Sequence, residues 1–249
     1  MVRSWLSRPH SGLAEIGALA VLYGVYELLR GSGDDRLDAA MANTADIVAL
    51  ERHLHVFVEG AIQRAAESVG FLPPLLGLAY MGLHFLGTTG ALVWVHRRHR
   101  PRFPIVRTTL VFSTALALVG YRLYPAAPPR LTDLGFSDTV SSSTGLNLSS
   151  DALGALYNPI AAVPSLHFGY AAIVGAMLVA FAARPWLRAA GAIYPAVMLA
   201  VIVATGNHFF LDAVLGGVVA LVGWLGARLL LQARRERVDA RSFRAGVPA

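Results

Sequence analysis

The sequence contains neither cysteine nor lysine, and only 14 % of its 249 residues are charged. The absence of cysteine excludes disulfide bonds, thiolate catalysis and cysteine-ligated metal sites. A soluble domain of this length usually carries about a quarter charged residues. Hydrophobic residues make up 55 % of the chain and stand in long runs. We therefore expect a membrane protein and not a large soluble core.

The positive charge is carried entirely by arginine, and the formal net charge is +6. A basic membrane protein is better suited to anionic lipid headgroups than to nucleic acid, so no nucleic-acid partner is expected. The N-terminus has a basic start and an apolar stretch from Leu13 to Leu29. This stretch contains Glu15 and Glu27 and is not followed by a small-x-small cleavage pattern. We interpret it as a retained first helix.

Six segments are long and apolar enough to cross about 30 Å of hydrocarbon. They run roughly over residues 13–29, 71–96, 105–124, 161–183, 186–205 and 208–231. The expected fold is all-α, a single membrane domain over 1–249 with six transmembrane helices. Between the first two segments, residues 34–69 have apolar side chains at near-helical spacing with acidic residues among them. This pattern predicts amphipathic helix lying along the membrane surface.

The distribution of arginine orients the expected bundle. Most of the 21 arginines lie in the N-terminus, the 97–107 loop, the 184–188 turn and the C-terminal tail over 232–249. The positive-inside rule places these segments, and both termini, in the cytoplasm. The stretch 34–69, the loop 125–158 and the turn near Asn207 would then lie outside, at the plasma membrane surface.

Polar residues at the ends of membrane helices suggest functional sites because they are costly there. Three such clusters fall on the expected outer face: Arg122-Leu-Tyr-Pro-Ala-Ala-Pro-Pro-Arg130, Asn158-Pro-Ile-Ala-Ala-Val-Pro-Ser-Leu-His167 and Thr205-Gly-Asn-His208-Phe-Phe-Leu-Asp212. The arginine count and the position of the clusters are independent signals, and they agree.

The second cluster predicts an anion site at a helix start. Pro164 suits the first position of a helix, where a missing N–H costs nothing. Ser165, Leu166 and His167 would then offer free backbone N–H groups at a positive helix end. In the first cluster, Arg122 and Arg130 supply guanidinium groups suited to phosphate oxygens.

The third cluster predicts an activated histidine. Asn207 is expected to cap the sixth helix. His208 and Asp212 are four residues apart and share a helix face. The carboxylate can accept a hydrogen bond from one imidazole nitrogen, which leaves the other nitrogen as a nucleophile.

The paired patterns Pro-Ser-x-His and His-x-x-x-Asp resemble the type 2 phosphatidic acid phosphatase superfamily. The fuller strings Tyr124-Pro-Ala-Ala-Pro-Pro-Arg130 and Gly206-Asn-His-Phe-Phe-Leu-Asp212 are most similar to its branch related to inositol phosphorylceramide synthase. The resemblance covers a catalytic core over about residues 70–225. It implies a metal-independent enzyme that needs no cofactor.

The resemblance also implies roles for the matching residues. His208 would form a phosphohistidine, Asp212 would orient it, and His167 would protonate the leaving alcohol. Phosphoryl oxygens would be held by Ser165 and the arginines, with Asn207 beside them. The family's third motif usually has an arginine six positions before the nucleophile, but here that position is Ile202. Its first motif usually begins with lysine and ends in Arg-Pro, whereas Arg122 and Pro-Pro-Arg130 stand here. The arginine that replaces the missing one is left open.

Plainer interpretations exist for each of these residues. His208 and Asp212 could be a structural pair at a helix start, or could bind a metal together with His167. Arg130 could anchor the membrane interface. Tyr80 and His84, four apart in the second segment, could line a substrate cleft, but a buried packing pair is favoured.

The sequence therefore predicts a membrane phosphoesterase or phosphotransferase acting on a lipid phosphate or phosphodiester. Water as acceptor gives a phosphatase, and a polyol or lipid alcohol gives a head-group transferase. The rival is a transporter or channel with a charged outer vestibule. It would need polar residues through the membrane interior, and the last three segments are almost wholly apolar beyond their outer ends.

Overall fold

The computed structural model describes residues 36–145 and 160–244, and every regular element in these ranges is helical. Two helices, α2 (Leu37–His53) and α3 (Glu59–Glu67), come before the bundle. The bundle itself contains the following helices: α4 (Leu72–Gly82), α5 (Thr88–Arg98), α6 (Phe103–Leu123), α9 (Leu166–Phe181), α10 (Pro185–Ala204) and α11 (Phe210–Arg244). A short helix, α7 (Thr139–Thr144), packs against α4.

Four helical stretches in the described ranges are long and apolar enough to cross a membrane. They are Leu72–Arg98, Arg100–Leu123, Pro185–Ala204 and Phe210–Arg237. Helix α9 is apolar but has only 16 residues, which span about 24 Å at 1.5 Å per residue. The segment predicted over 13–29 lies outside the described residues. The all-helical membrane fold is thus confirmed, and the count of six crossings stays a prediction.

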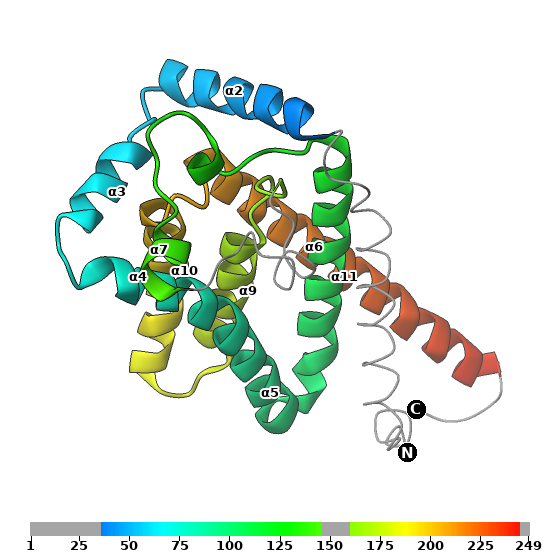
Figure 1. Cartoon of the computed structure of the whole chain (residues 1–249). Coiled ribbons are helices and arrows are strands. Elements are labelled where there is room, and N and C mark those ends of the chain that lie inside the picture. The colour runs from blue at the N-terminus through cyan, green and yellow to red at the C-terminus, as the bar shows by residue number, and fades with distance from the viewer. Residues whose placement is uncertain (1–35, 146–159, 245–249) are drawn as a thin grey trace.

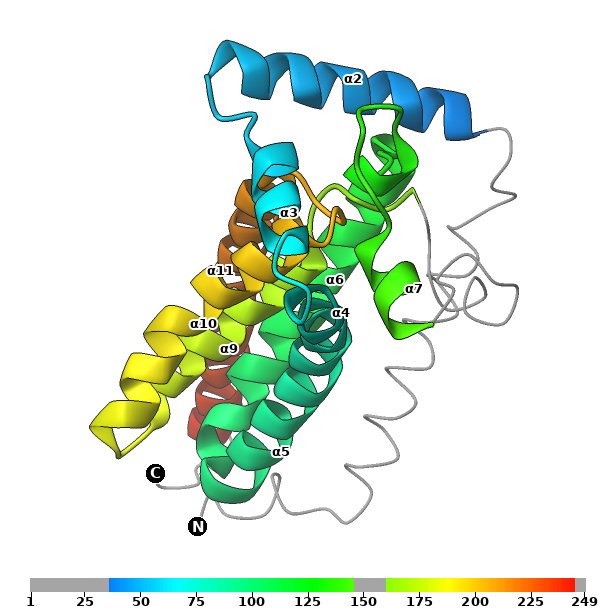
Figure 2. The same cartoon turned by 60° about the vertical axis from the view of Figure 1, so that its left-hand side comes forward.

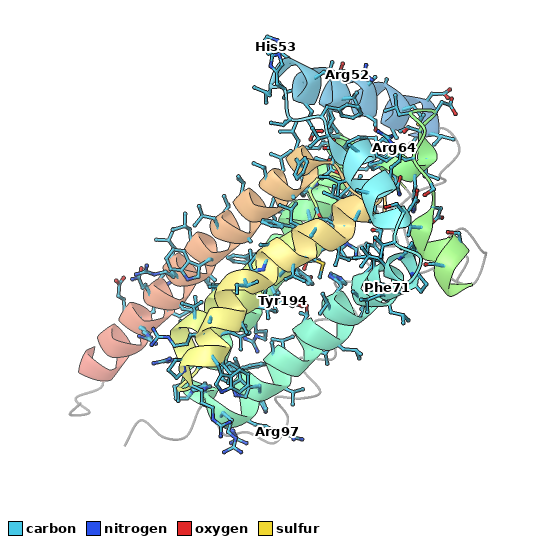
Figure 3. The ribbon with its side chains drawn as sticks, turned by 90° about the vertical axis from the view of Figure 1, so that its left-hand side faces the viewer. Arg52, His53, Arg64, Phe71, Arg97 and Tyr194 are labelled. Carbon is cyan, nitrogen blue, oxygen red and sulfur yellow. The ribbon has the colours of Figure 1, made fainter. Side chains whose placement is uncertain are left out.

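Helix α2 lies across one end of the bundle, and α3 follows it beside α10 (Figures 1 and 2). The helix predicted within residues 34–69 is confirmed for Leu37–His53 and Glu59–Glu67, and its position along the membrane surface stays a prediction. Arg52, His53 and Arg64 mark this end, while Arg97 lies at the opposite end (Figure 3). The connections α5–α6 and α9–α10 are also at that opposite end (Figure 2).

Small residues set the distance between the long helices. Helix–helix association in a membrane depends on close packing because lipid is as apolar as the side chains. A Cβ added to Gly175 of α9 would lie 2.5 Å from the carbonyl oxygen of Gly191 in α10. In the same way Gly223 of α11 lies against Ser113 of α6, and a Cβ on Gly226 would meet Phe112. The glycines of α11 thus permit contacts that any larger side chain would prevent.

The helix from Leu72 to Arg98 is interrupted by a π-helical turn at Leu83–Gly87. Such turns insert one extra residue per turn, which redirects the side chains near them. The carbonyl of Leu83 accepts a hydrogen bond of 2.6 Å from the hydroxyl of Tyr194, which lies midway along α10 (Figure 3). This turn places His84 in the interior of the bundle, where it meets the second cluster.

Candidate active site

The third cluster forms a tight turn between α10 and α11. Gly206 has φ of +68°, and a Cβ there would approach Gln63 and Ser137 within 3.0 Å. The carbonyl of Ile202 accepts from the backbone N–H groups of Asn207 at 3.0 Å and His208 at 3.2 Å. Ile202 is fully buried. The position where the resemblance leads one to expect an arginine therefore holds a core residue that fixes the turn.

The predicted contact between His208 and Asp212 is present, although His208 lies two residues before α11 and so does not share a face of that helix. Nδ1 of His208 lies 3.2 Å from Oδ2 of Asp212, and the same oxygen accepts from the backbone N–H of Phe209 at 2.9 Å. Asp212 is fully buried and His208 is 5 % exposed. In the tautomer in which Nδ1 donates to Asp212, the lone pair on Nε2 is available for attack.

Helix α9 begins at Leu166, two residues later than the start at Pro164 that the sequence predicts. Ser165 is the N-cap, and its hydroxyl oxygen accepts from the N–H of Phe168 at 3.4 Å. Pro164 precedes the helix and does not occupy its first position, so that prediction was wrong. The N–H of Ser165 is not free, because it donates to the carbonyl of Asp212 at 2.9 Å. A Cβ on Gly216 would overlap the carbonyl oxygen of Ser165. Close packing therefore joins the second cluster directly to the third.

His167 is part of a stack of aromatic rings next to His208. Its ring centroid lies 5.5 Å from that of His208, 4.3 Å from Tyr80 and 4.2 Å from His84. His84 in turn stacks on Tyr170. The structure thus gives Tyr80 and His84 a packing role, as favoured from the sequence, but their packing partner is the proposed general acid. His84 also carries a buried Nδ1 without a hydrogen-bond partner among the described residues.

The first cluster reaches the others through its backbone. Ala126 and Ala161 form an isolated parallel bridge, and the N–H of Arg130 donates to the carbonyl of Gly206 at 2.9 Å. The Arg130 side chain is buried, with Nε 3.9 Å from a carboxylate oxygen of Asp138. A buried, tethered arginine is unlike a side chain that merely anchors a membrane interface.

Arg122 and Asn207 are placed differently from Arg130. The Arg122 side chain is exposed in the last turn of α6. Asn207 is buried within the turn, and its amide donates to the hydroxyl of Thr205 at 2.9 Å. Helix α11 begins at Phe210, so Asn207 does not cap it, and the expectation of an N-cap there was wrong. Asn158 lies outside the described residues.

Comparison with known proteins identifies the family. A family model described as the PAP2 superfamily matches residues 45–226. The chain belongs to the PAP2 superfamily. This match begins inside α2, so it extends further toward the N-terminus than the core predicted over residues 70–225. No solved structure matches the chain.

A curated relative of this PAP2 protein is the phosphoinositol dihydroceramide synthase of Bacteroides thetaiotaomicron. The two are 28 % identical over 137 residues, which are 50 % of this chain and 44 % of the relative. The chain thus matches less than half the length of that protein. Family and relative together confirm the resemblance to the branch of inositol phosphorylceramide synthase. They support an enzyme of the lipid phosphatase or phosphotransferase kind and weigh against a channel or transporter.

Two acidic residues of this PAP2 protein belong to the site, although the sequence predicts them to be part of the amphipathic surface helix over residues 34–69. Glu51 and Glu59 are fully buried at the start of α11. The buried residues of α2 are Ala40, Thr44, Ile47, Val48 and Glu51. This spacing places Glu51 on the buried face, so the helical period could have revealed it.

One cavity lies away from these residues. It has a volume of about 470 Å³ and is formed between α6, α9 and α11, with Thr109, Met177 and Trp224 in its lining. Most of its lining residues on α9 belong to the half of that helix remote from His167. Within residues 36–145 and 160–244, no group of three or more histidine and acidic side chains is arranged to hold a metal ion.

Proposed function

We propose that this protein transfers a phosphoryl-containing group from a lipid through a covalent intermediate on His208. The observation that carries the proposal is the pairing of Nδ1 of His208 with Oδ2 of Asp212 at 3.2 Å, beside a second histidine ring at 5.5 Å. One histidine is oriented by a buried carboxylate, and the other is close enough to serve the same phosphorus centre. Nucleophile, orienting group and acid are the parts that a two-step displacement needs.

In the first step Nε2 of His208 attacks phosphorus, an N–P bond forms, and the P–O bond to the leaving alcohol breaks. His167 gives its proton to the leaving oxygen. In the second step His167 takes a proton from water or an alcohol, a new P–O bond forms, and the N–P bond breaks. Asp212 supports the positive charge that develops on the imidazole of His208.

Arg130 is the strongest candidate for the phosphate clamp. It is buried, and its backbone is tied to the turn that carries His208, so its charge would act in a medium that screens it little. A guanidinium can bind two phosphoryl oxygens together. Ser165 and Asn207 are joined to the same turn and would add neutral hydrogen bonds. Arg122 is exposed at the end of α6, so it would contact the substrate only from outside the buried site.

The substrate is proposed to be a membrane lipid carrying a phosphate or phosphodiester. The apolar helices around the site would keep the acyl chains in the bilayer, and the clamp would take the headgroup. The relative is a phosphoinositol dihydroceramide synthase, and this name favours transfer to an acceptor alcohol over hydrolysis. A polyol phosphate unit moved between lipid alcohols is the corresponding proposal for this chain.

The test is incubation of purified protein in detergent micelles with labelled phosphatidic acid, or with phosphatidylinositol plus ceramide, in the presence of a chelator. Release of phosphate identifies a phosphatase, and a new phosphosphingolipid identifies a transferase. The variant His208→Ala is the control, because the intermediate cannot form without its imidazole. Turnover that survives in His208→Ala, or that stops only when the chelator is added, would contradict the proposed mechanism.

The site is proposed to face the outside of the plasma membrane, with both termini in the cytoplasm. The arginine-rich connections and the site lie at opposite ends of the bundle, which supports this orientation through the positive-inside rule. Since the chain has no cysteine, single-cysteine labelling is clean. Ser142→Cys should react with an impermeant thiol reagent in intact cells, and Arg97→Cys should react only after permeabilisation. The reverse pattern would place the site inside.

A further inference from the structure

Two carboxyl groups from outside the bundle bind the first turn of α11. Glu51 lies in the last turn of α2 and Glu59 is the first residue of α3, and both are fully buried. Oε1 of Glu51 accepts from the N–H of Leu211 at 2.7 Å. Oε1 of Glu59 accepts from the N–H of Phe210 at 3.2 Å. The surface helices thus reach directly into the turn that carries the histidine.

Together with Asp212, the two glutamates occupy three consecutive amides. Asp212 accepts from the N–H of Phe209, and the glutamates take the next two. The first N–H groups of a helix have no partner within it and carry partial positive charge. One side chain from the same segment usually satisfies them. Here two of the three acceptors come from α2 and α3, distant in sequence.

The second carboxylate oxygens of Glu51 and Glu59 are both buried and have no hydrogen-bond partner among the described residues, and a proton shared between the two carboxyl groups would satisfy both. Two buried carboxylates cannot both be charged at contact distance, so the pair must share a proton. Burial, the hydrogen bond to Glu59 and the nearby charges of Glu59 and Asp212 raise the pKa of Glu51 to about 9, although the bond from Leu211 acts the other way. A Glu51 carboxyl group with this raised pKa carries a proton at neutral pH, and that proton is available to bridge to Glu59.

We propose that Glu51 and Glu59, sharing one proton, are positioning residues that fix the turn from which His208 and Asp212 project. This inference rests on the proposed function, since it takes His208 as the nucleophile. Neither glutamate touches the reacting atoms. Both act through the backbone of α11, and so they make α2 and α3 part of the catalytic framework and not only a cover at its end.

The shared proton gives the proposal a specific signature. In Glu51→Gln the amide can still donate to Glu59, and its oxygen can still accept from Leu211, but there is no proton to lose. In Glu51→Ala the N–H of Leu211 loses its acceptor and the turn loosens. A displacement of about 1 Å at a reacting group can cost about 10²-fold in rate. Alanine and glutamine should therefore differ strongly at the same position.

The experiment compares Glu51→Ala, Glu51→Gln and the matched control Asp46→Asn, which changes an exposed carboxylate of the same helix. At pH 7, kcat should fall by about 10-fold to 10²-fold in the alanine variant while KM changes little, because only the transition-state geometry is lost. Glutamine and the control should stay within about twofold of the parent protein.

The pH profile separates positioning from a merely structural role. Parent kcat should fall as pH rises through about 9, where Glu51 ionises against Glu59. This alkaline limb should be absent or displaced upward in Glu51→Gln. An unchanged limb in Glu51→Gln, a loss in glutamine equal to that in alanine, or full kcat in alanine would each overturn the proposal.

Thermal unfolding tests the proton pair even if no lipid is turned over. A raised pKa means that the contribution of Glu51 to stability is complete below its ordinary pKa of 4.5 and is lost as pH rises toward 9. The unfolding temperature of the parent should therefore decline over this window relative to Glu51→Gln. Parallel curves would refute the shared proton. Absence of turnover in the parent protein, with diverging curves, would refute the proposed function alone.

Discussion

The stack of rings around His167 allows its role as a proton donor to be tested apart from its role in packing. The ring of His167 packs against those of Tyr80 and His84, with centroid distances of 4.3 and 4.2 Å. Truncation to alanine would remove both contacts, each worth about 0.5–1.5 kcal/mol. His167→Phe keeps a flat ring in the same slot and removes only the proton. Phenylalanine is therefore the informative substitution.

The expected loss depends on the leaving group. A general acid typically contributes about 10²–10⁴-fold, which corresponds to about 2.7–5.4 kcal/mol of transition-state stabilisation. His167→Phe should lose this much on a lipid phosphate, whose alkoxide needs a proton. A nitrophenyl phosphate ester leaves as a weak base, so its turnover should fall by less than about tenfold. Both rates are measured on the same detergent-purified protein at saturating substrate.

The matched control is His99→Phe, the same substitution at the opposite end of the bundle, where His99 packs edge-on against Trp94. It should keep both activities. Equal losses on the two esters in His167→Phe would show that the ring serves binding or packing and not proton transfer. Unimpaired turnover of the lipid phosphate would remove His167 from the mechanism altogether.

Three further predictions follow from the same contacts. Asp212→Asn should preserve the unfolding temperature within a few degrees but lower turnover by about 10³-fold or more, as in triad enzymes; normal turnover would exclude it as the orienting group. Arg130→Ala should impair turnover of every phosphate ester, and Arg130→Lys should restore it only in part because lysine lacks the fork; full activity in the alanine variant would make it an anchor. Gly216→Ala should cost about 1–3 kcal/mol through overpacking against α9 and lower both stability and activity, whereas Gly90→Ala, which meets open space, should change neither; equal unfolding temperatures would show that α9 and α11 can separate without harm.

Much of this protein can be predicted from local sequence because its signals are strong and short in range. Apolar runs define the bundle helices, and the absence of cysteine and the shortage of charge define the class. Pro-Ser-x-His and His-x-x-x-Asp gave the family, and the second pattern gave the contact of His208 with Asp212, since residues four apart at a helix start lie close together wherever the helix lies. Their pairing at 3.2 Å needed no knowledge of the tertiary fold.

The exact starts of α9 and α11 could not be predicted, because turn geometry decides them. Pro164 and Asn207 both have the local character of helix starts, yet Ser165 and the residues around Phe209 take those places. The N–H of Ser165 is bound to α11 and the N–H of Asn207 to Ile202. The first of these contacts joins distant segments and the second belongs to the turn itself, and both outweigh the weak preference of a single residue for a cap.

The sequence by itself determined the membrane class, the family and the pairing of His208 with Asp212. Only the tertiary structure decided what surrounds them: the buried position of Arg130, the ring of His84 against His167, and Glu51 and Glu59 at the start of α11. Each of these depends on the approach of helices separated by scores of residues. A buried carboxyl group is costly unless a partner is present; the helical period can place Glu51 on a buried face, but the partner, a row of backbone amides at the start of α11, cannot be predicted from the sequence around either glutamate.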